Sequence, residues 1–204
     1  MRRPFGGGGG AIDWLVVGLG NPGREHEGTR HNVGFTVAEA LARRWNFSRA
    51  KDRFRGRLAE GRVHRETPGA QPGPPAVRVA VLCPQTYMND AGRSVGPARG
   101  SYELALERVL VVHDEIDLRF GEVRARTGGG LAGHNGLKSI KRELGGGDFT
   151  RVRVGVGRPD SSDPEIVSAY VLGRFREGRE QVAELIERAC EQVERVVLGE
   201  QPAA

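Results

Sequence analysis

The sequence contains no long apolar run, and this absence argues against a membrane-spanning helix. No apolar stretch approaches the roughly 20 residues that a helix needs to cross a bilayer. Arg2 and Arg3 are followed by glycines at positions 6–10, where a secretory signal would need an apolar segment. We therefore interpret residues 1–12 as a flexible leader and expect the protein to reside in the cytoplasm.

Cysteine is almost absent, with Cys83 and Cys190 the two in a chain of 204 residues. Neither has a second cysteine or a histidine at the spacing of a zinc site, so the sequence predicts no zinc centre. Cys83 ends an apolar, strand-like run, and Cys190 lies in a helical pattern. We expect both to be buried, free thiols.

Charge is unevenly distributed along a chain whose formal net charge is +5. Residues 176–200 hold four arginines and seven glutamates, whereas residues 119–153 hold eight Lys or Arg against three acidic residues. Positive charge gathered in one segment favours a polyanionic partner such as nucleic acid. A solvated face with scattered charges is the alternative, and the composition leaves it open.

Strand-like and helix-like segments alternate along the chain. Apolar runs and alternating patterns predict strands, and apolar residues at helical spacing predict helices. No repeat and no interdomain linker interrupts them, so residues 13–200 are expected to form one domain. The predicted class is α/β, a single three-layer globular domain around a mixed, mostly parallel sheet. The expected strands are 14–19, 77–82, 109–112, 122–126 and 151–156, the expected helices start after an Asn32 cap and at 135–144 and 179–198, and 64–75 is expected to be a loop.

Polar clusters follow three of the predicted strands. GNPG comes after the first, PQTYMN after the second and HDEID after the third. Ligands of α/β sheets bind beyond the carboxyl ends of the strands, so we expect these clusters to meet in one crevice. Asn21, Asn89 and Asp114 belong to the clusters, while His31 and Asn135 lie near the starts of predicted helices.

The side chains of this expected crevice suit attack by water on an acyl bond. Histidine titrates near neutral pH, so His31 can accept a proton from water. Asp114 is the candidate partner that would hold the ring in one tautomer. The uncharged amide of Asn21 can hold an ester carbonyl or a developing oxyanion. No cysteine, serine or lysine is well placed as a covalent nucleophile, so the pattern predicts an activated water.

Each of these residues also has an ordinary structural interpretation. Asn21 is typical of a turn, and Asn89 and Asn135 are typical of helix caps. His31 at a helix start could be a surface or capping residue, and Asp114 could pair with an arginine. The residues taken singly do not decide between these interpretations.

Three further patterns match known motifs less well. Residues 18–23 fit the dinucleotide-binding GxGxxG, but no helix is predicted to open there. Residues 92–96 fit the GxSxG of serine hydrolases, but no strand leads directly into the serine. Asp114, Glu115 and Asp117 offer oxygen ligands, but no second acidic cluster completes a hard-cation site.

Taken together, the segments resemble the bacterial peptidyl-tRNA hydrolase family. The matching stretches are VVGLGNPGREHEGTRHNVGF, PQTYMNDAG, VLVVHDEIDLRFGEVRARTGG, GHNGLKSI and RVRVGVGRP, in family order over residues 14 to about 159. The combination of GLGNPG…TRHN with GHNGL is highly specific. The resemblance implies a monomeric α/β enzyme without metal or cofactor. Its expected reaction is hydrolysis of the ester between a peptide and the 3′ end of tRNA.

The resemblance also implies roles for individual residues. His31 matches the proton acceptor, Asp114 the residue that stabilises its basic form, and Asn21 the residue that separates blocked from free aminoacyl-tRNA. Three others match positions that bind the tRNA 3′ end and the peptide, namely Tyr87, Asn89 and Asn135. Two residues of the basic segment match contacts to acceptor-stem phosphates, which give affinity without reading sequence, namely Arg126 and Arg153.

Two residues depart from the family pattern. His26 stands where the family usually has tyrosine; imidazole can still stack and hydrogen-bond, so we expect weakened or retuned substrate binding. Leu131 lies in the glycine-rich loop before GHNG and is expected to change how that loop closes. A non-catalytic RNA-binding accessory factor on the same scaffold is the competing interpretation, and the presence of every proposed catalytic residue favours the enzyme.

Overall fold

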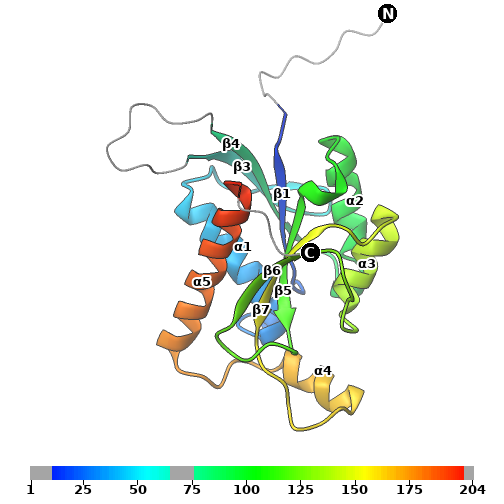
Figure 1. Cartoon of the computed structure of the whole chain (residues 1–204), viewed down its shortest axis with the longest axis vertical. Helices are drawn as coiled ribbons and strands as arrows, with labels where there is room; N and C mark the ends of the chain where they lie inside the picture. Colours follow the sequence, from blue (N-terminus) through cyan, green and yellow to red (C-terminus); the bar gives the residue numbers. More distant parts are fainter. Residues whose placement is uncertain (1–10, 65–75, 200–204) are drawn as a thin grey trace, which may run out of the picture.

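Seven strands form one sheet in the order β2-β3-β4-β1-β5-β7-β6 in the computed structural model, which describes residues 11–64 and 76–199 (Figure 1). The four central strands, β4, β1, β5 and β7, run parallel, and the outer pairings are antiparallel. The strands are β1 Trp14–Gly18, β2 Lys51–Arg53, β3 Gly56–Val63, β4 Val77–Pro84, β5 Val109–Glu115, β6 Val123–Thr127 and β7 Thr150–Gly155. The predicted mixed sheet of an α/β domain is confirmed, with antiparallel strands at both edges.

Helices cover both faces of the sheet and give the molecule three layers (Figure 1). α1 and α5 pack together on one face, and α2 and α3 pack together on the other. The helices are α1 Val33–Arg44, α2 Gly92–Ser101, α3 Asn135–Leu144, α4 Pro164–Leu172 and α5 Arg179–Val197, with 3-10 turns η1 Arg24–His26, η2 Arg30–Asn32, η3 Met88–Asp90 and η4 Leu106–Arg108. α4 lies beyond the carboxyl ends of the parallel strands, away from both layers of helices.

The core is divided by the sheet into two apolar clusters. Val16 and Val112 face α1 and α5, whereas Val17 and Val111 face α2 and α3, and all four are fully buried. Successive side chains of a strand point to opposite faces, so a strand covered on both sides needs a continuous apolar run. With both faces covered, the strand ends remain as the place where polar side chains can meet a ligand.

Two regions were not predicted from the sequence. β2 and β3 form a polar hairpin at the sheet edge, where exposed alternate residues weaken the apolar signal. α4 begins at an Asp163 cap but has no buried residue, so it shows no apolar stripe of the usual kind. Most of the expected leader (residues 1–12) and of the expected loop (residues 64–75) lies outside the described residues. Ile12, the last residue of that leader, is buried in the core.

The described residues bear on the sequence predictions about membrane-spanning helices and about the two cysteines. No helix among residues 11–64 and 76–199 is long and apolar enough to span a membrane. Cys83 and Cys190 are both buried and free, as the sequence predicts. Burial raises the pKa of Cys83 to about 12 and that of Cys190 to about 11, so neither thiol ionises readily near neutral pH.

Candidate active site

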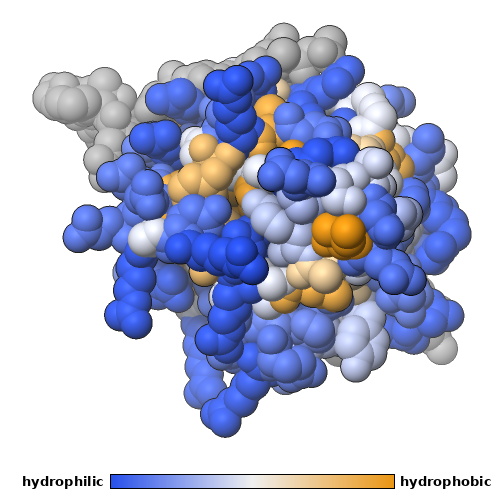
Figure 2. Space-filling view, turned by 90° about the horizontal axis from the view of Figure 1, so that it is seen from below, coloured by the Kyte–Doolittle hydropathy of each residue, from blue (hydrophilic) through white to orange (hydrophobic). Residues whose placement is uncertain are grey.

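A cleft of about 850 Å³ lies at the carboxyl ends of the parallel strands, with α4 on one side. Figure 2 views this end of the molecule, where apolar patches lie among hydrophilic residues. All three polar clusters contribute to the lining, so the prediction that they meet in one crevice is confirmed. Six predicted site residues line the cleft: Asn21, His31, Tyr87, Asn89, Asp114 and Asn135.

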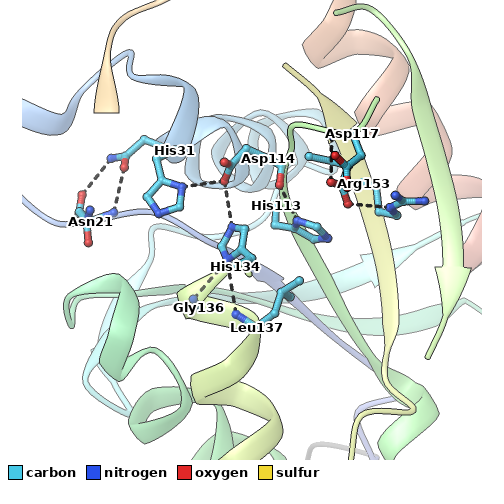
Figure 3. A network of polar contacts seen from close by, with 11 residues as sticks. Asn21, His31, His113, Asp114, Asp117, His134, Gly136, Leu137 and Arg153 are labelled. Atoms are coloured by element: carbon cyan, nitrogen blue, oxygen red, sulfur yellow. Dashed lines mark hydrogen bonds and ion pairs between the residues drawn. The ribbon is translucent and has the colours of Figure 1, made fainter. Parts of the chain in front are cut away.

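At the centre of the cleft, His31 of η2 meets Asp114 of β5 (Figure 3). His31 Nδ1 lies 2.9 Å from Asp114 Oδ1, and the carboxylate side chain is 3% exposed. An ionised carboxylate only accepts hydrogen bonds, so Nδ1 of His31 carries the hydrogen. The lone pair of the ring is therefore on Nε2, the nitrogen available for accepting a proton from a molecule in the cleft.

The turn that carries His31 is fixed on both sides by buried neighbours. Arg30 Nη1 donates to Arg174 O at 2.6 Å, and the guanidinium lies 4.2 Å from the ring centroid of Tyr170. On the other side, Asn32 Nδ2 donates to Asn21 O and Asn32 Oδ1 accepts from Asn21 N, both at 2.9 Å. Asn32 is the N-cap residue of α1 as expected, but its side chain makes no capping hydrogen bond, because it is used in this pairing.

A glycine allows the start of α1 to approach the sheet. A Cβ on Gly34 would lie 2.4 Å from both Leu19 N and Val112 O, closer than real Cβ contacts allow. The close approach also lets Phe35 N donate to Leu19 O at 3.1 Å. Any larger residue at position 34 would push the turn with His31 away from the end of β5.

Asn21 has one orientation in the cleft because its amide oxygen is already used. Met88 N donates to Asn21 Oδ1 at 2.7 Å, and a backbone N–H can only be paired with the oxygen of the amide. The NH₂ group of Asn21 is therefore left as a hydrogen-bond donor on the cleft side. Such a donor suits a carbonyl or a developing oxyanion.

Asp114 receives a second imidazole from the opposite side. His134 Nε2 lies 3.0 Å from the same Oδ1 atom that contacts His31. Burial by itself raises the pKa of Asp114, but the electrostatic interactions and hydrogen bonds of the His31 and His134 rings outweigh it and hold that pKa well below its usual range. The carboxylate is thus ionised near neutral pH. The sequence analysis assigned no role to His134, which directly precedes Asn135.

His113 precedes Asp114 and is buried beside His134. Its Nδ1 donates to Asp114 O at 2.7 Å, while its Nε2 has no hydrogen-bond partner among the described residues. Burial, followed by the electrostatic effect of the neighbouring His134 ring, lowers the pKa of His113 to about 3. His113 is therefore a neutral side chain at the edge of the His31–Asp114 pair.

This burial predicts an acid sensitivity of folding. Between pH 6.5 and about 3, the unfolded chain binds a proton at His113 that the folded chain does not. The free energy of unfolding should therefore fall as the pH drops through this window, by on the order of a few kcal/mol. Urea unfolding at a series of pH values should show a shallower dependence in His113→Asn than in wild type. A matched His64→Ala change at an exposed histidine should keep the wild-type slope; equal slopes in all three proteins would contradict the assignment.

Of the remaining predicted residues, three lie at the rim of the cleft and three lie outside it. Tyr87 is 63% exposed, and Asn89 and Asn135 are also exposed, so these three present side chains at the opening. His26 lies in η1, 3.8 Å from Glu25, and is outside the cleft lining. The two predicted phosphate contacts are outside it as well.

The arginines of β6 and β7 lie on one face of the sheet edge. Arg126 pairs in register with Arg151, and Arg124 with Arg153. Arg151 is buried and donates to the carbonyls of Gly128 and Gly130, so it supports the glycine-rich loop and is unavailable to a phosphate.

Arg153 is already paired in the folded chain. Its Nε donates to Glu115 Oε2 at 2.9 Å.

In the glycine-rich loop, Leu131 packs against the apolar cluster beneath α2 and α3, and its carbonyl accepts from His134 N at 2.9 Å. The residue that departs from the family pattern thus anchors the loop to the core.

The competing motifs do not form the sites they would require. Ser94 of GxSxG is fully buried within α2, and the GxGxxG segment leads into the short turn η1. The acidic groups after β5 are separately paired, Glu115 with Arg153 and Asp117 with Arg158.

Within the described ranges, one cluster has its potential ligand atoms close enough together to hold a metal ion. It comprises His31, Asp114 and His134, whose ligand atoms all lie within 4.8 Å of one another. Backbone N–H groups occupy Nδ1 of His134, so a metal at its Nε2 would displace the hydrogen that now bonds Asp114. These contacts favour proton transfer as the chemistry of the cluster.

The fold and site define a class of single-domain α/β proteins with a carboxylate-held histidine in a cleft at the carboxyl edge of the sheet. Comparison with known sequences narrows this class. The peptidyl-tRNA hydrolase family matches residues 15–204, and the chain belongs to that family.

Relatives and a solved structure agree with the family assignment. A peptidyl-tRNA hydrolase of Geobacillus thermodenitrificans (strain NG80-2) is 43% identical over 184 residues, covering 90% of this chain and 92% of the relative. One from Mycobacterium sp. (strain KMS) is 46% identical over 195 residues, with 93% of each chain covered. The crystal structure of peptidyl-tRNA hydrolase from Acinetobacter baumannii superposes with a TM-score of 0.75 at 38% identity, covering 94% of this chain and 92% of that one.

Proposed function

We propose that this chain hydrolyses the ester that joins a peptide to the 3′ end of tRNA, with His31 as general base and Asp114 as its orienting partner. The observation that carries the proposal is the 2.9 Å contact between His31 Nδ1 and Asp114 Oδ1 at the wall of an open cleft. Membership in the peptidyl-tRNA hydrolase family supports the substrate. The reaction regenerates tRNA from peptidyl-tRNA that has left the ribosome.

In the proposed mechanism, water is the nucleophile. Nε2 of His31 takes a proton from water as the water oxygen bonds to the ester carbonyl carbon. Collapse of the tetrahedral intermediate breaks the bond to the ribose oxygen, which receives the proton from His31. The products are a peptide carboxylic acid and tRNA with a free 3′ hydroxyl. Asp114 stabilises the imidazolium that forms in between.

Asn21 supplies a donor that distinguishes the substrate. Its NH₂ group faces the cleft because Met88 N–H holds its oxygen. In the proposal, this group bonds a carbonyl of the blocked amino acid, which a free aminoacyl-tRNA lacks.

Among the described residues, no thiol or hydroxyl is hydrogen-bonded to His31, as a covalent nucleophile activated by that base would be. Both thiols are buried with raised pKa values, and Ser94 lies inside α2. Direct attack by water is therefore the route that the side chains support. It requires no cofactor and no metal, since the base, the orienting acid and the donor all come from the chain.

The tRNA is proposed to lie across the cleft rim and the adjacent sheet edge. Tyr87, Asn89 and Asn135 are placed to contact the 3′ end and the peptide, with Tyr87 offering a 63% exposed ring for stacking. His26 is proposed to contact the substrate from η1. Because such tRNA arises during translation, we expect the enzyme to act in the cytoplasm. We also expect it to act as a monomer, since a single chain holds every proposed residue.

Arg126 and Arg153 are expected to add phosphate affinity without taking part in the chemistry. Arg126→Ala should weaken tRNA binding and reduce the salt dependence of log K by about one, with kcat unchanged at saturation. Arg153→Ala should be made together with Glu115→Gln, so that no buried carboxylate is left unpaired. Arg62→Ala, an exposed arginine of β3 toward the opposite sheet edge, is the matched control. Equal salt slopes in the control and the variants would contradict the assignment.

The function is tested by ester release from N-blocked and free aminoacyl-tRNA, measured beside tRNA binding. The proposal predicts rapid release from the blocked substrate and little from the free one. Binding of both without release would instead support the alternative of an RNA-binding accessory factor on the same scaffold.

A further inference from the structure

His134 is held at both ring nitrogens, which determines its tautomer (Figure 3). Nδ1 accepts from Gly136 N at 3.2 Å and from Leu137 N at 3.4 Å, so the ring is the side-chain N-cap of α3. Backbone N–H groups can only donate, and Nδ1 must therefore carry the lone pair. The single ring hydrogen lies on Nε2 and is directed at Asp114 Oδ1, 3.0 Å away.

The same contacts disfavour a second proton on the His134 ring. A proton on Nδ1 would replace two hydrogen bonds with repulsion from two N–H groups, at the positive end of the α3 dipole. His134 thus gives Asp114 a hydrogen bond without giving it a positive charge. His31 differs, because its second ring nitrogen has no such backbone partner and can take up a proton.

One oxygen of Asp114 is consequently shared between two donors. His31 Nδ1 and His134 Nε2 lie 2.9 Å and 3.0 Å from Oδ1, and the two ring centroids are 5.0 Å apart. Each hydrogen bond to an ionised carboxylate stabilises its charge and reduces its attraction for a further proton nearby. The donor from His134 therefore competes with the pull that Asp114 exerts on a proton held by His31.

The other charged groups around this trio are accounted for. His113 of β5 packs edge-on against His134 with ring centroids 5.1 Å apart, and its lowered pKa keeps it neutral. α4 contributes no charged side chain to the cleft lining. The remaining charges near the cleft are paired or bonded to carbonyls: Glu115 with Arg153, Arg158 with Asp117, Arg30 with Glu177, and Arg151 with the glycine-rich loop.

We propose that His134 is a positioning residue. Its Nε2 hydrogen bond fixes Asp114 Oδ1 and shares the negative charge of the carboxylate, so that Asp114 still orients His31 but attracts a proton on that ring less strongly. The proposal rests on the function assigned above to His31. It explains why a histidine and not one of the usual short polar caps begins α3: the ring caps the helix with one nitrogen and reaches Asp114 with the other.

Two substitutions separate this role from a purely structural one. Asn is among the best N-cap residues, so His134→Asn keeps the cap of α3, but its short side chain loses the reach to Asp114. Gln places an amide N–H about where Nε2 lies, so His134→Gln keeps the donor and weakens the cap. We expect the acid limb of the kcat/KM profile to move up by roughly one pH unit in His134→Asn, with KM nearly unchanged, and to stay near wild type in His134→Gln. The proposal would be overturned if His134→Asn were as active as wild type while His134→Gln lost activity in proportion to a loss of thermal stability.

A readout independent of turnover keeps the test separate from the proposed function. In ¹⁵N-histidine-labelled protein, the midpoint of the His31 titration should rise in His134→Asn and return in His134→Gln. An unchanged midpoint in His134→Asn would overturn the role of His134 even in an active enzyme. If the midpoint rises in His134→Asn but the wild-type protein releases no peptide, the role of His134 stands and the proposed reaction is wrong.

Discussion

His31→Ala is expected to lower kcat by roughly 10²- to 10⁴-fold while tRNA binding remains near wild type. The substitution removes the nitrogen that accepts a proton from water, but it leaves the cleft rim and the sheet-edge arginines in place. No other group of the cleft lining replaces the base, because His113, Asp114 and Glu115 are buried. His134 uses its free lone pair to cap α3. Single-turnover release from N-blocked aminoacyl-tRNA measures the chemical step, and filter binding measures affinity.

His64→Ala is the matched control for this experiment. His64 is exposed and follows β3 at the end of the sheet remote from the cleft, so its removal should change neither quantity. Release by His31→Ala at the wild-type rate would remove His31 from the mechanism. A parallel loss of binding would indicate a role in substrate contact instead of proton transfer.

Asp114→Asn is expected to lower kcat by a comparable factor, roughly 10²- to 10⁴-fold, although the side chain has almost the same shape. The neutral amide no longer stabilises an imidazolium, and it no longer requires His31 to keep its hydrogen on Nδ1. The sign of the pH effect follows from the lost charge: without the carboxylate, protonated His31 is less stable, so the acid limb of the rate profile should move to lower pH.

This shift distinguishes an electrostatic role from a packing role. Asp114→Asn should also remain folded at neutral pH, since two imidazole donors can still bond its carbonyl oxygen. Circular dichroism and thermal melting provide that check. A large loss of kcat with an unmoved acid limb would show that Asp114 acts through something other than its charge on His31.

The central part of the fold could be predicted from sequence because burial on both faces imposes apolar runs. β1, β4 and β5 appear as such runs, and the predicted α3 matches the observed Asn135–Leu144. β2, β3 and α4 were missed because exposed edge strands and an unburied helix lack a strong periodic signal. Their placement depends on contacts that only the assembled sheet provides.

The site shows the same limit at the level of single residues. Placing polar clusters after strands was sufficient to bring Asn21, Asn89 and Asp114 into one cleft, whereas His31 was assigned from its residue type and from the family resemblance. It could not show that Asn32 pairs with the backbone of Asn21, because a helix-start asparagine is equally typical of a cap. It also could not show that His134 shares Asp114, since the two are 20 residues apart and meet only through the start of α3.

The central claim, that Asp114 holds His31 with its Nε2 lone pair toward the cleft, is tested most directly by ¹⁵N NMR of the histidine rings above the midpoint of the His31 titration. With signals assigned through single His substitutions, we predict hydrogen on Nδ1 of His31 and on Nε2 of His134. In Asp114→Asn, we predict that the hydrogen of the His31 ring no longer prefers Nδ1. Hydrogen on Nε2 of His31 in the wild-type protein would contradict the account, because the ring would then offer water no lone pair.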